Sequence, residues 1–219
     1  MLAVAAGAQE QPQNPDQQLS MLLYKSDQTK VMGDIAAALK GYEQALERVK
    51  SDPALKNREE EVLQRLAGAY IAIQQPVDAI RVSRRILAFH EEDCKPGALS
   101  IERCADAQYG LGLALMHAGE FLGAVAQLSE SAANFGKVSM VGDEPYRMTK
   151  MKQRGDAESL LAAALFRAGQ KEKSTAMFRT AIATLKIVSG NEKLDPGTRG
   201  SALKSQTDAE GSLKLLEGK

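Results

Sequence analysis

The sequence has no tryptophan, few other aromatic residues and no excess of charge of either sign. Its 28 basic and 28 acidic side chains cancel, so nothing in the overall charge attracts nucleic acid phosphates or an anionic bilayer. The chain also lacks an apolar run of about eighteen residues, the length that a membrane-spanning helix needs. We therefore predict no nucleic acid partner and no membrane span.

Signatures of catalysis are missing as well. The sequence contains no glycine-rich phosphate loop and no nucleophile elbow, and neither of its two histidines lies beside a candidate nucleophile. We predict a protein that is not an enzyme and has no cofactor. A metal- or small-ligand-dependent enzyme assembled from distant residues is a remote alternative. The residues of zinc-ligand type lack the close paired spacing of structural zinc sites; they are His90, Cys94, Cys104 and His117.

The chain has only two cysteines, and they lie close together in the sequence. Cys94 and Cys104 stand on either side of Lys95-Pro96-Gly97. In an exported protein they would form a disulfide across a loop of about ten residues, which would stabilise the fold by roughly 2–3 kcal/mol. In a reducing compartment they would be two ordinary thiols. Both alternatives are open at this point.

Residues 1–15 differ in composition from the rest. Leu2 to Ala8 is a short run of small apolar residues that ends in Ala6-Gly7-Ala8, a pattern typical of signal-peptide cleavage sites, although the basic leading region is missing. Gln9 to Gln18 contains two prolines and five glutamines and reads as a solvated linker. We predict a disordered signal-peptide remnant and linker, and hence a bacterial protein exported to the periplasm or beyond. The alternative is an ordinary disordered end on a cytoplasmic protein.

From residue 16 onward the apolar residues follow helical spacing. One pattern occurs three times, at Leu66-Ala67-Gly68-Ala69-Tyr70 and again at 111–115 and 161–165, each time followed by a short polar turn and a second apolar helix. Gly119 and Gly169 are suited to the left-handed turn that ends a helix, Asn57 to a cap and Pro76 to a first helical turn. The spacing predicts helix pairs at 16–31 and 33–51, 57–74 and 76–90, 100–118 and 120–134, and 155–168 and 170–188.

These residues resemble the tetratricopeptide repeat (TPR) family over about residues 16 to 188. The third repeat matches best, with Leu111, Gly112, Gly119, Phe121 and Ala124, and no repeat is complete. The resemblance implies an all-α fold, a right-handed superhelical array of antiparallel helix pairs over 16–190. Residues 191–219, with Asp195-Pro196 and a helix at 202–216, would form a C-terminal capping helix.

The resemblance also predicts where small residues are needed. Ala38, Ala79 and Ala124 fall where the two helices of a pair would cross, and a larger side chain there would overpack the crossing. The repeats are longer than usual, because the turn positions Gly33, Gln74, Gly119 and Gly169 lie 41, 45 and 50 residues apart, against about 34 in the family. The longest excess, at 135–154, is either a ligand-contacting loop or a linker with an extended helix start.

The family implies that a partner binds to the concave face formed by the first helix of each pair. Carried over by position, that face consists of Glu61, Gln64, Gly68, Asp106, Tyr109, Leu113, Met116, Asp156, Ser159, Ala163, Phe166 and Arg167. The Lys, Asn and Arg clamp of the members that bind chaperone tails is absent. The resemblance thus predicts an adaptor that holds a peptide or an amphipathic helix, with a row of acids favouring a basic flank.

Two alternatives to this groove are open. In the first, the residues of the concave face pack against neighbouring helices, and the acids cap helix starts. In the second, the protein is a homo-oligomeric platform in which an uncapped edge of the array or the Leu19-Met21-Leu22-Leu23 face pairs with another copy.

Overall fold

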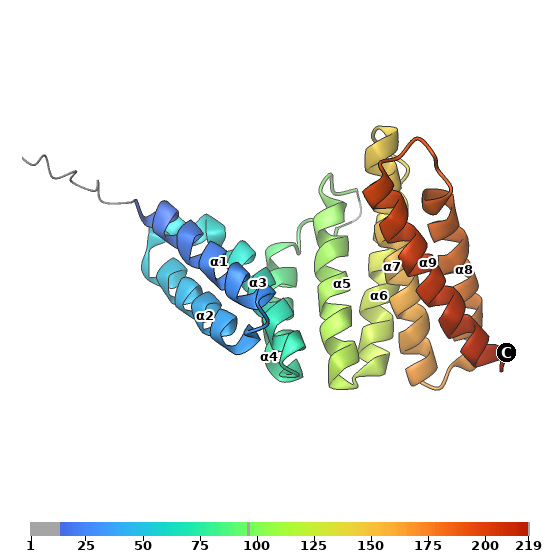
Figure 1. Ribbon diagram of the computed structural model, residues 1–219, viewed down its shortest axis with the longest axis horizontal. Coiled ribbons are helices and arrows are strands. Elements are labelled where there is room, and N and C mark those ends of the chain that lie inside the picture. Colours follow the sequence, from blue (N-terminus) through green and yellow to red (C-terminus); the bar gives the residue numbers. More distant parts are fainter. Residues whose placement is uncertain (1–13, 96, 219) are drawn as a thin grey trace, which may run out of the picture. The chain divides into compact units, whose positions relative to one another are not determined.

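The chain folds into helices that follow one another without strands throughout residues 14–95 and 97–218, the part that the computed structural model describes (Figure 1). The all-α prediction is confirmed. The predicted signal-peptide remnant falls almost wholly on residues 1–13, which lie outside the described residues. By packing, the chain divides into two compact units, with the boundary between Ala69 and Tyr70. The predicted domain limits, 16–190 and 191–219, stay a prediction.

Unit 1, described from residue 14 to residue 69, contains α1 (Pro15–Val31), α2 (Ile35–Ser51), the 3-10 helix η1 (Pro53–Arg58) and most of α3 (Glu59–Ala72). Asn14 and Asp34 cap α1 and α2 by accepting hydrogen bonds from backbone N–H groups of the first turn. Asp52 caps η1 in the same way. Asn57 lies inside η1, so the prediction that it caps the next helix is wrong.

The core of unit 1 forms where α1 crosses α2. Leu19 and Tyr42 are fully buried, and Leu23 is almost so. A Cβ added to Gly41 would lie 2.0 Å from the Ser26 hydroxyl, which shows how close the two helices come. Because Leu19 and Leu23 are used inside the unit, the apolar face considered for self-association is not free as a whole. Met21 remains 42% exposed, and self-association stays a prediction.

Unit 2 begins at Tyr70 and is a row of helices in which each packs against the next. Its helices are α4 (Pro76–Phe89), α5 (Ile101–Ala118), α6 (Phe121–Val138), α7 (Glu144–Arg167), α8 (Lys171–Ser189) and α9 (Pro196–Glu217). Gly119 and Gly169 both have φ 78° and connect α5 to α6 and α7 to α8, as predicted. Pro76 occupies the first turn of α4.

Two helix starts in unit 2 were misplaced by sequence reasoning. α7 begins at Glu144 rather than at Gly155, with Asp143 as its cap and Pro145 in its first turn. The 135–154 segment is therefore the end of α6, a short linker and an extended helix start, not a long loop. Similarly, α9 begins at Pro196, capped by Asp195, rather than at Ala202.

Small residues lie at the tight contacts of unit 2. Ala79 and Ala124 are fully buried, as is Ala38 in unit 1. A Cβ added to Gly112 of α5 would lie 2.6 Å from Cγ of Leu128 of α6, and one added to Gly155 of α7 would lie 2.6 Å from Cγ of Leu185 of α8. The helices of these two pairs are therefore held at a separation that a larger side chain would disturb.

Candidate functional site

The predicted face residues on α5 and α7 are brought together in unit 2, where they line two hollows. The first, here called the polar pocket, has a volume of about 400 Å³. Its walls come from α5, α7, α8 and α9. It is lined by Tyr109, Asp156, Ser159, Leu160, Ala163, Phe178, Ser205, Asp208, Ala209 and Ser212.

The second hollow, here called the apolar pocket, has a volume of about 440 Å³. It lies nearer the ends of α5 and α7, beside the turn into α6. It is lined by Leu113, Met116, His117, Gly119, Phe121, Leu160 and Arg167. Leu160 belongs to both pockets, so the two adjoin, and together they are called the groove below.

Most of the predicted residues of unit 2 line this groove. Four are in the polar pocket and three in the apolar pocket: Tyr109, Asp156, Ser159 and Ala163, then Leu113, Met116 and Arg167. Asp106 and Phe166 line neither pocket. Asp106 accepts a hydrogen bond from Nε2 of Gln153 at 3.2 Å, and Phe166 is 47% exposed. Their role in binding stays a prediction.

Helix α9 supplies groove residues that sequence reasoning missed. Ser205, Asp208 and Ser212 line the polar pocket, whereas the sequence alone indicated only a cap with a solvated outer face. Their spacing of i, i+3 and i+7 places them on one face of a helix. This shared face is the signal that the sequence carries, and tertiary packing decides what the face meets.

The polar pocket contains two carboxylates, Asp156 and Asp208, of which only Asp156 forms an ion pair within the described residues. Asp156 accepts from Nζ of Lys152 at 2.6 Å, whereas the Asp208 carboxylate forms no ion pair within the described ranges. Burial and the charge of Asp156 raise the pKa of the Tyr109 phenol. The Ser159 hydroxyl is buried and has no hydrogen-bond partner among the described residues. The pocket thus offers one unpaired negative charge and an unsatisfied hydroxyl.

Farther toward the start of α5 and α7, the charged groups neutralise one another. Glu102 accepts a hydrogen bond from the Tyr146 hydroxyl, which raises the pKa of that phenol to about 12. Nζ of Lys150 lies 3.6 Å from Glu102 and 5.5 Å from the centre of the Tyr146 ring. Desolvation by the surrounding protein raises the pKa of Asp106. These acids are less available to a partner than Asp208.

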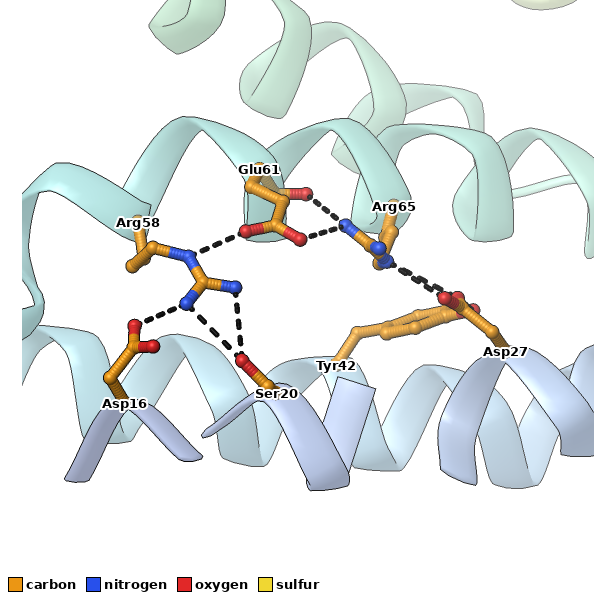
Figure 2. Close-up of polar contacts among 7 residues, drawn as sticks. All are labelled: Asp16, Ser20, Asp27, Tyr42, Arg58, Glu61 and Arg65. Atoms are coloured by element: carbon orange, nitrogen blue, oxygen red, sulfur yellow. Dashed lines mark hydrogen bonds and ion pairs between the residues drawn. The ribbon is translucent and has the colours of Figure 1, made fainter. Parts of the chain in front are cut away.

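The predicted face residues of α3 belong to unit 1, where Glu61 has structural partners (Figure 2). Its two carboxylate oxygens accept from Nε of Arg58 at 2.6 Å and from Nη1 of Arg65 at 3.0 Å. Glu61 is thereby committed to a polar network within unit 1. Gln64 is exposed and Gly68 half-buried, and neither residue lines the polar pocket or the apolar pocket.

The same network joins α1, α2 and α3. Arg58 also pairs with Asp16, and Nε of Arg65 donates to Asp27 at 3.1 Å. The Tyr42 hydroxyl donates to the same Asp27 at 2.7 Å, and Figure 2 shows these side chains converging from α1, α2, α3 and, for Arg58, the end of η1. Burial, with this hydrogen bond, raises the pKa of the Tyr42 phenol. The network links the helices of unit 1 beside their apolar core and leaves Glu61 without a free charge for a ligand.

A larger hollow of about 610 Å³ lies on the side of α6 and α8. Its charged floor is Glu158, which is 3% exposed and accepts from Arg154 and Thr184, each at 2.7 Å. Because both carboxylate oxygens of Glu158 already accept hydrogen bonds from the protein, this hollow offers a ligand fewer unpaired polar groups than the groove does.

Cys94, in the connection between α4 and α5, forms a disulfide with Cys104 near the start of α5. Bonded to each other, they are not available as thiolate ligands for the zinc alternative. Within the described residues, no three His, Cys, Asp or Glu side chains are grouped as a metal site would require. The described residues likewise include no helix that is long and apolar enough to cross a membrane.

No protein-family model matches the sequence, and the search of curated proteins gives no match. Among solved structures, the fold is similar to a putative kinesin light chain of Podosopora anserina with nearly identical TPR-like repeats, at TM-score 0.60 and 17% identity, covering 94% of this chain and 92% of that one. A variant of the same protein matches at TM-score 0.61 and 17% identity, covering 95% and 93%. This chain has a TPR-like repeat fold. MamA matches at TM-score 0.49 and 20% identity, covering 89% of this chain and 97% of that one.

The TPR-like resemblance predicted from the sequence is thus confirmed at the level of the fold. In TPR-like terms, α5 and α7 are the first helices of the last two pairs, and α9 stands where the first helix of a further pair would follow. The groove therefore lies along the first helices of these two pairs, and α9 adds a further wall to it.

Proposed function

We propose that this protein is a non-enzymatic adaptor that holds a peptide or helix of a partner protein in the groove of unit 2. The observation that carries the proposal is the pair of adjoining pockets on α5, α7 and α9, which contain seven of the residues predicted to bind. The TPR-like fold supports it, because such repeats present extended binding surfaces.

The groove has the mixed chemistry of a peptide site. Leu113, Met116 and Phe121 offer apolar surface in one pocket, while serines and acids line the other. Sites of this kind bind through buried apolar anchors and gain specificity from a few placed polar groups.

We further propose that the protein works outside the cytoplasm. The Cys94–Cys104 disulfide supports this location, because disulfides persist in oxidising compartments and are rare where thiols are kept reduced. Thiol alkylation of protein taken directly from source cells tests the proposal. Protein from the envelope fraction should resist alkylation until a reductant is added. Alkylation without reductant would show that the thiols are free and would remove the support for export.

Pull-down from an envelope extract tests the adaptor proposal. The native protein is compared with a variant carrying Leu113→Arg and Met116→Glu in the apolar pocket. A matched control carries Leu122→Arg and Ala126→Glu on α6, where both positions are exposed and outside the groove. Circular dichroism first establishes that all three proteins are folded.

A partner retained by the native and control proteins and lost by the groove variant supports the proposal and identifies the client. A partner bound equally by the groove variant would show that binding occurs elsewhere, with the hollow beside α6 and α8 as the next surface to test.

A further inference from the structure

The two pockets of the groove differ in the side chain that each accommodates. In the polar pocket, Lys152 already neutralises Asp156, so the unpaired carboxylate of Asp208 gives the pocket its negative charge. A cation placed there would gain a partner without displacing an existing one. The pocket therefore favours a lysine or arginine side chain over an acidic one.

The apolar pocket favours a different side chain. Leu113, Met116 and Phe121 form an apolar lining, with Leu160 at the border to the polar pocket. Arg167 also lines this pocket and forms no ion pair within the described part of the chain. A basic side chain entering here would meet like charge, whereas an aliphatic or aromatic one would bury apolar surface. The charges thus fix which pocket takes the cation.

The spacing of the pockets limits the ligand's sequence. On α5, the polar pocket includes Tyr109 and the apolar pocket includes Leu113 to His117, four to eight residues farther along. At a rise of about 1.5 Å per residue, the pockets are about 6–12 Å apart. In an extended peptide, side chains on the same face repeat every two residues, about 6.8 Å. One such step falls within this range, whereas two steps, about 13.6 Å, exceed it.

The polar lining favours an extended ligand over a helical one. The buried Ser159 hydroxyl has no partner in the described structure, and Ser205 lines the same pocket. The Ser212 hydroxyl, which also lines it, donates to the Asp208 carbonyl at 3.0 Å and keeps only its capacity to accept. An extended peptide leaves main-chain N–H and C=O groups free to pair with such hydroxyls, whereas a helix uses these groups internally.

We propose that the groove binds an extended segment that carries a lysine or arginine two residues from an apolar residue, with the cation at Asp208 and the apolar side chain between α5 and α7. This proposal rests on the proposed function and names the ligand of the same groove. It makes α9, through Asp208, the helix that sets the charge preference.

Selection from a display library of random heptapeptides tests the ligand chemistry. The same library is selected on the native protein, on Leu113→Arg and on Asp208→Lys. A control, Glu192→Lys, makes the same change of charge at an exposed position outside both pockets. The native and control proteins should enrich peptides with Lys or Arg two residues from an apolar residue. Asp208→Lys should enrich Asp or Glu at the charged position and keep the apolar one.

A peptide of the selected consensus, labelled with fluorescein, then gives affinities by anisotropy. We expect Asp208→Lys to weaken its binding about tenfold, while Glu192→Lys leaves it unchanged.

The outcomes separate this inference from the proposed function. Peptides that need Leu113 but show no basic preference, or a preference that Asp208→Lys does not alter, would overturn the inference and leave the adaptor proposal standing. A basic and an apolar residue spaced by three or four positions would indicate a helical ligand and would overturn the extended segment. If the native protein enriches only peptides that the Leu113→Arg variant also enriches, the groove does not bind peptides and both proposals fail.

Discussion

Helices approach closely at glycines in both units of this chain, Gly41 in unit 1 included, but the contacts that supplement this packing differ. In unit 1, a polar network at the surface joins three helices, with Arg58 and Arg65 each bridging acids from α1 and α3. In unit 2, glycines let paired helices approach closely and a disulfide closes the α4–α5 connection. Ion pairs near solvent are weakened by added salt and by changes of pH that neutralise one partner. Close helix packing is instead disturbed by changes of side-chain volume. The units should therefore respond to different perturbations.

Removing the disulfide is expected to have the largest effect, confined to unit 2. Replacing Cys94 and Cys104 by alanine should lower its free energy of unfolding by roughly 2–3 kcal/mol, because the unfolded chain regains the freedom of a loop of about ten residues. Urea unfolding, followed by hydrogen exchange at amides of α5 and of α1, measures each unit. The double variant should no longer respond to a reductant, which serves as the control. Equal loss in both units would contradict the separation.

A pair of glycines on one helix tests the packing of unit 2. Gly112→Ala should cost about 1–2 kcal/mol, because the added Cβ would push against the fully buried Leu128. Gly110→Ala is the matched control on α5, since nothing lies within 4 Å of its added Cβ. It should stabilise the helix by up to about 1 kcal/mol. Urea midpoints of the two variants should move in opposite directions; a shift of the same sign would show that the crossing is loose.

The network of unit 1 should respond to salt. Arg58, whose side chain is 20% exposed, pairs with Asp16 and Glu61. Arg58→Met should lower the stability of unit 1 by about 1 kcal/mol in dilute buffer, and by less in about 1 M salt, where the screening length is near 3 Å. Arg81→Met on α4, whose pair with Asp78 is more exposed, is the control and should change little. An effect of Arg58→Met that does not vary with salt would assign it to packing.

The smallest expected effect concerns Tyr42 and alkaline pH. Its pKa is raised in the folded state by burial and by the hydrogen bond to Asp27, so its contribution to stability is fully present below about pH 10, the ordinary tyrosine value. Above that pH the unfolded tyrosine ionises while the folded one stays neutral, and stability falls. Tyr42→Phe should cost about 1 kcal/mol or less at neutral pH and should reduce the alkaline loss.

Urea unfolding of unit 1 between pH 8 and pH 11 measures this difference. Tyr24, which is 64% exposed, provides the control through Tyr24→Phe, which should leave the pH profile as it is. If the stability of the native protein and of Tyr42→Phe falls equally between pH 8 and pH 11, the ionisation of Tyr42 does not contribute to the alkaline loss of stability.

The sequence was sufficient wherever the local chemistry decides the backbone. Gly119 and Gly169 take positive φ, as their place after a helix predicts. The predicted start of α7 at 155 lies eleven residues too late, although Asp143 and Pro145 together form a cap followed by a first-turn proline.

The groove was predictable only in part. α5 and α7 positions follow from helical periodicity, and seven of them line the pockets. Asp208 of α9 was missed because its neighbours across the groove are set by tertiary packing. Glu61 was counted with the groove acids, yet Arg58 and Arg65 stand three and four residues from it on the chain, a spacing that places them beside it on a helix.

The way α9 is attached has a use in protein engineering. Only Ala202 and Ala209 of this helix are buried, and Leu213 and Leu216 pack partly buried against a core cluster. The exposed and half-buried polar positions of α9 are therefore the ones that tolerate change. A library that varies Ser205, Asp208 and Ser212 and keeps both alanines would alter one wall of the groove while α5 and α7 stay native. Binders with a new sequence preference can thus be selected by varying α9 alone, while the rest of the groove stays unchanged.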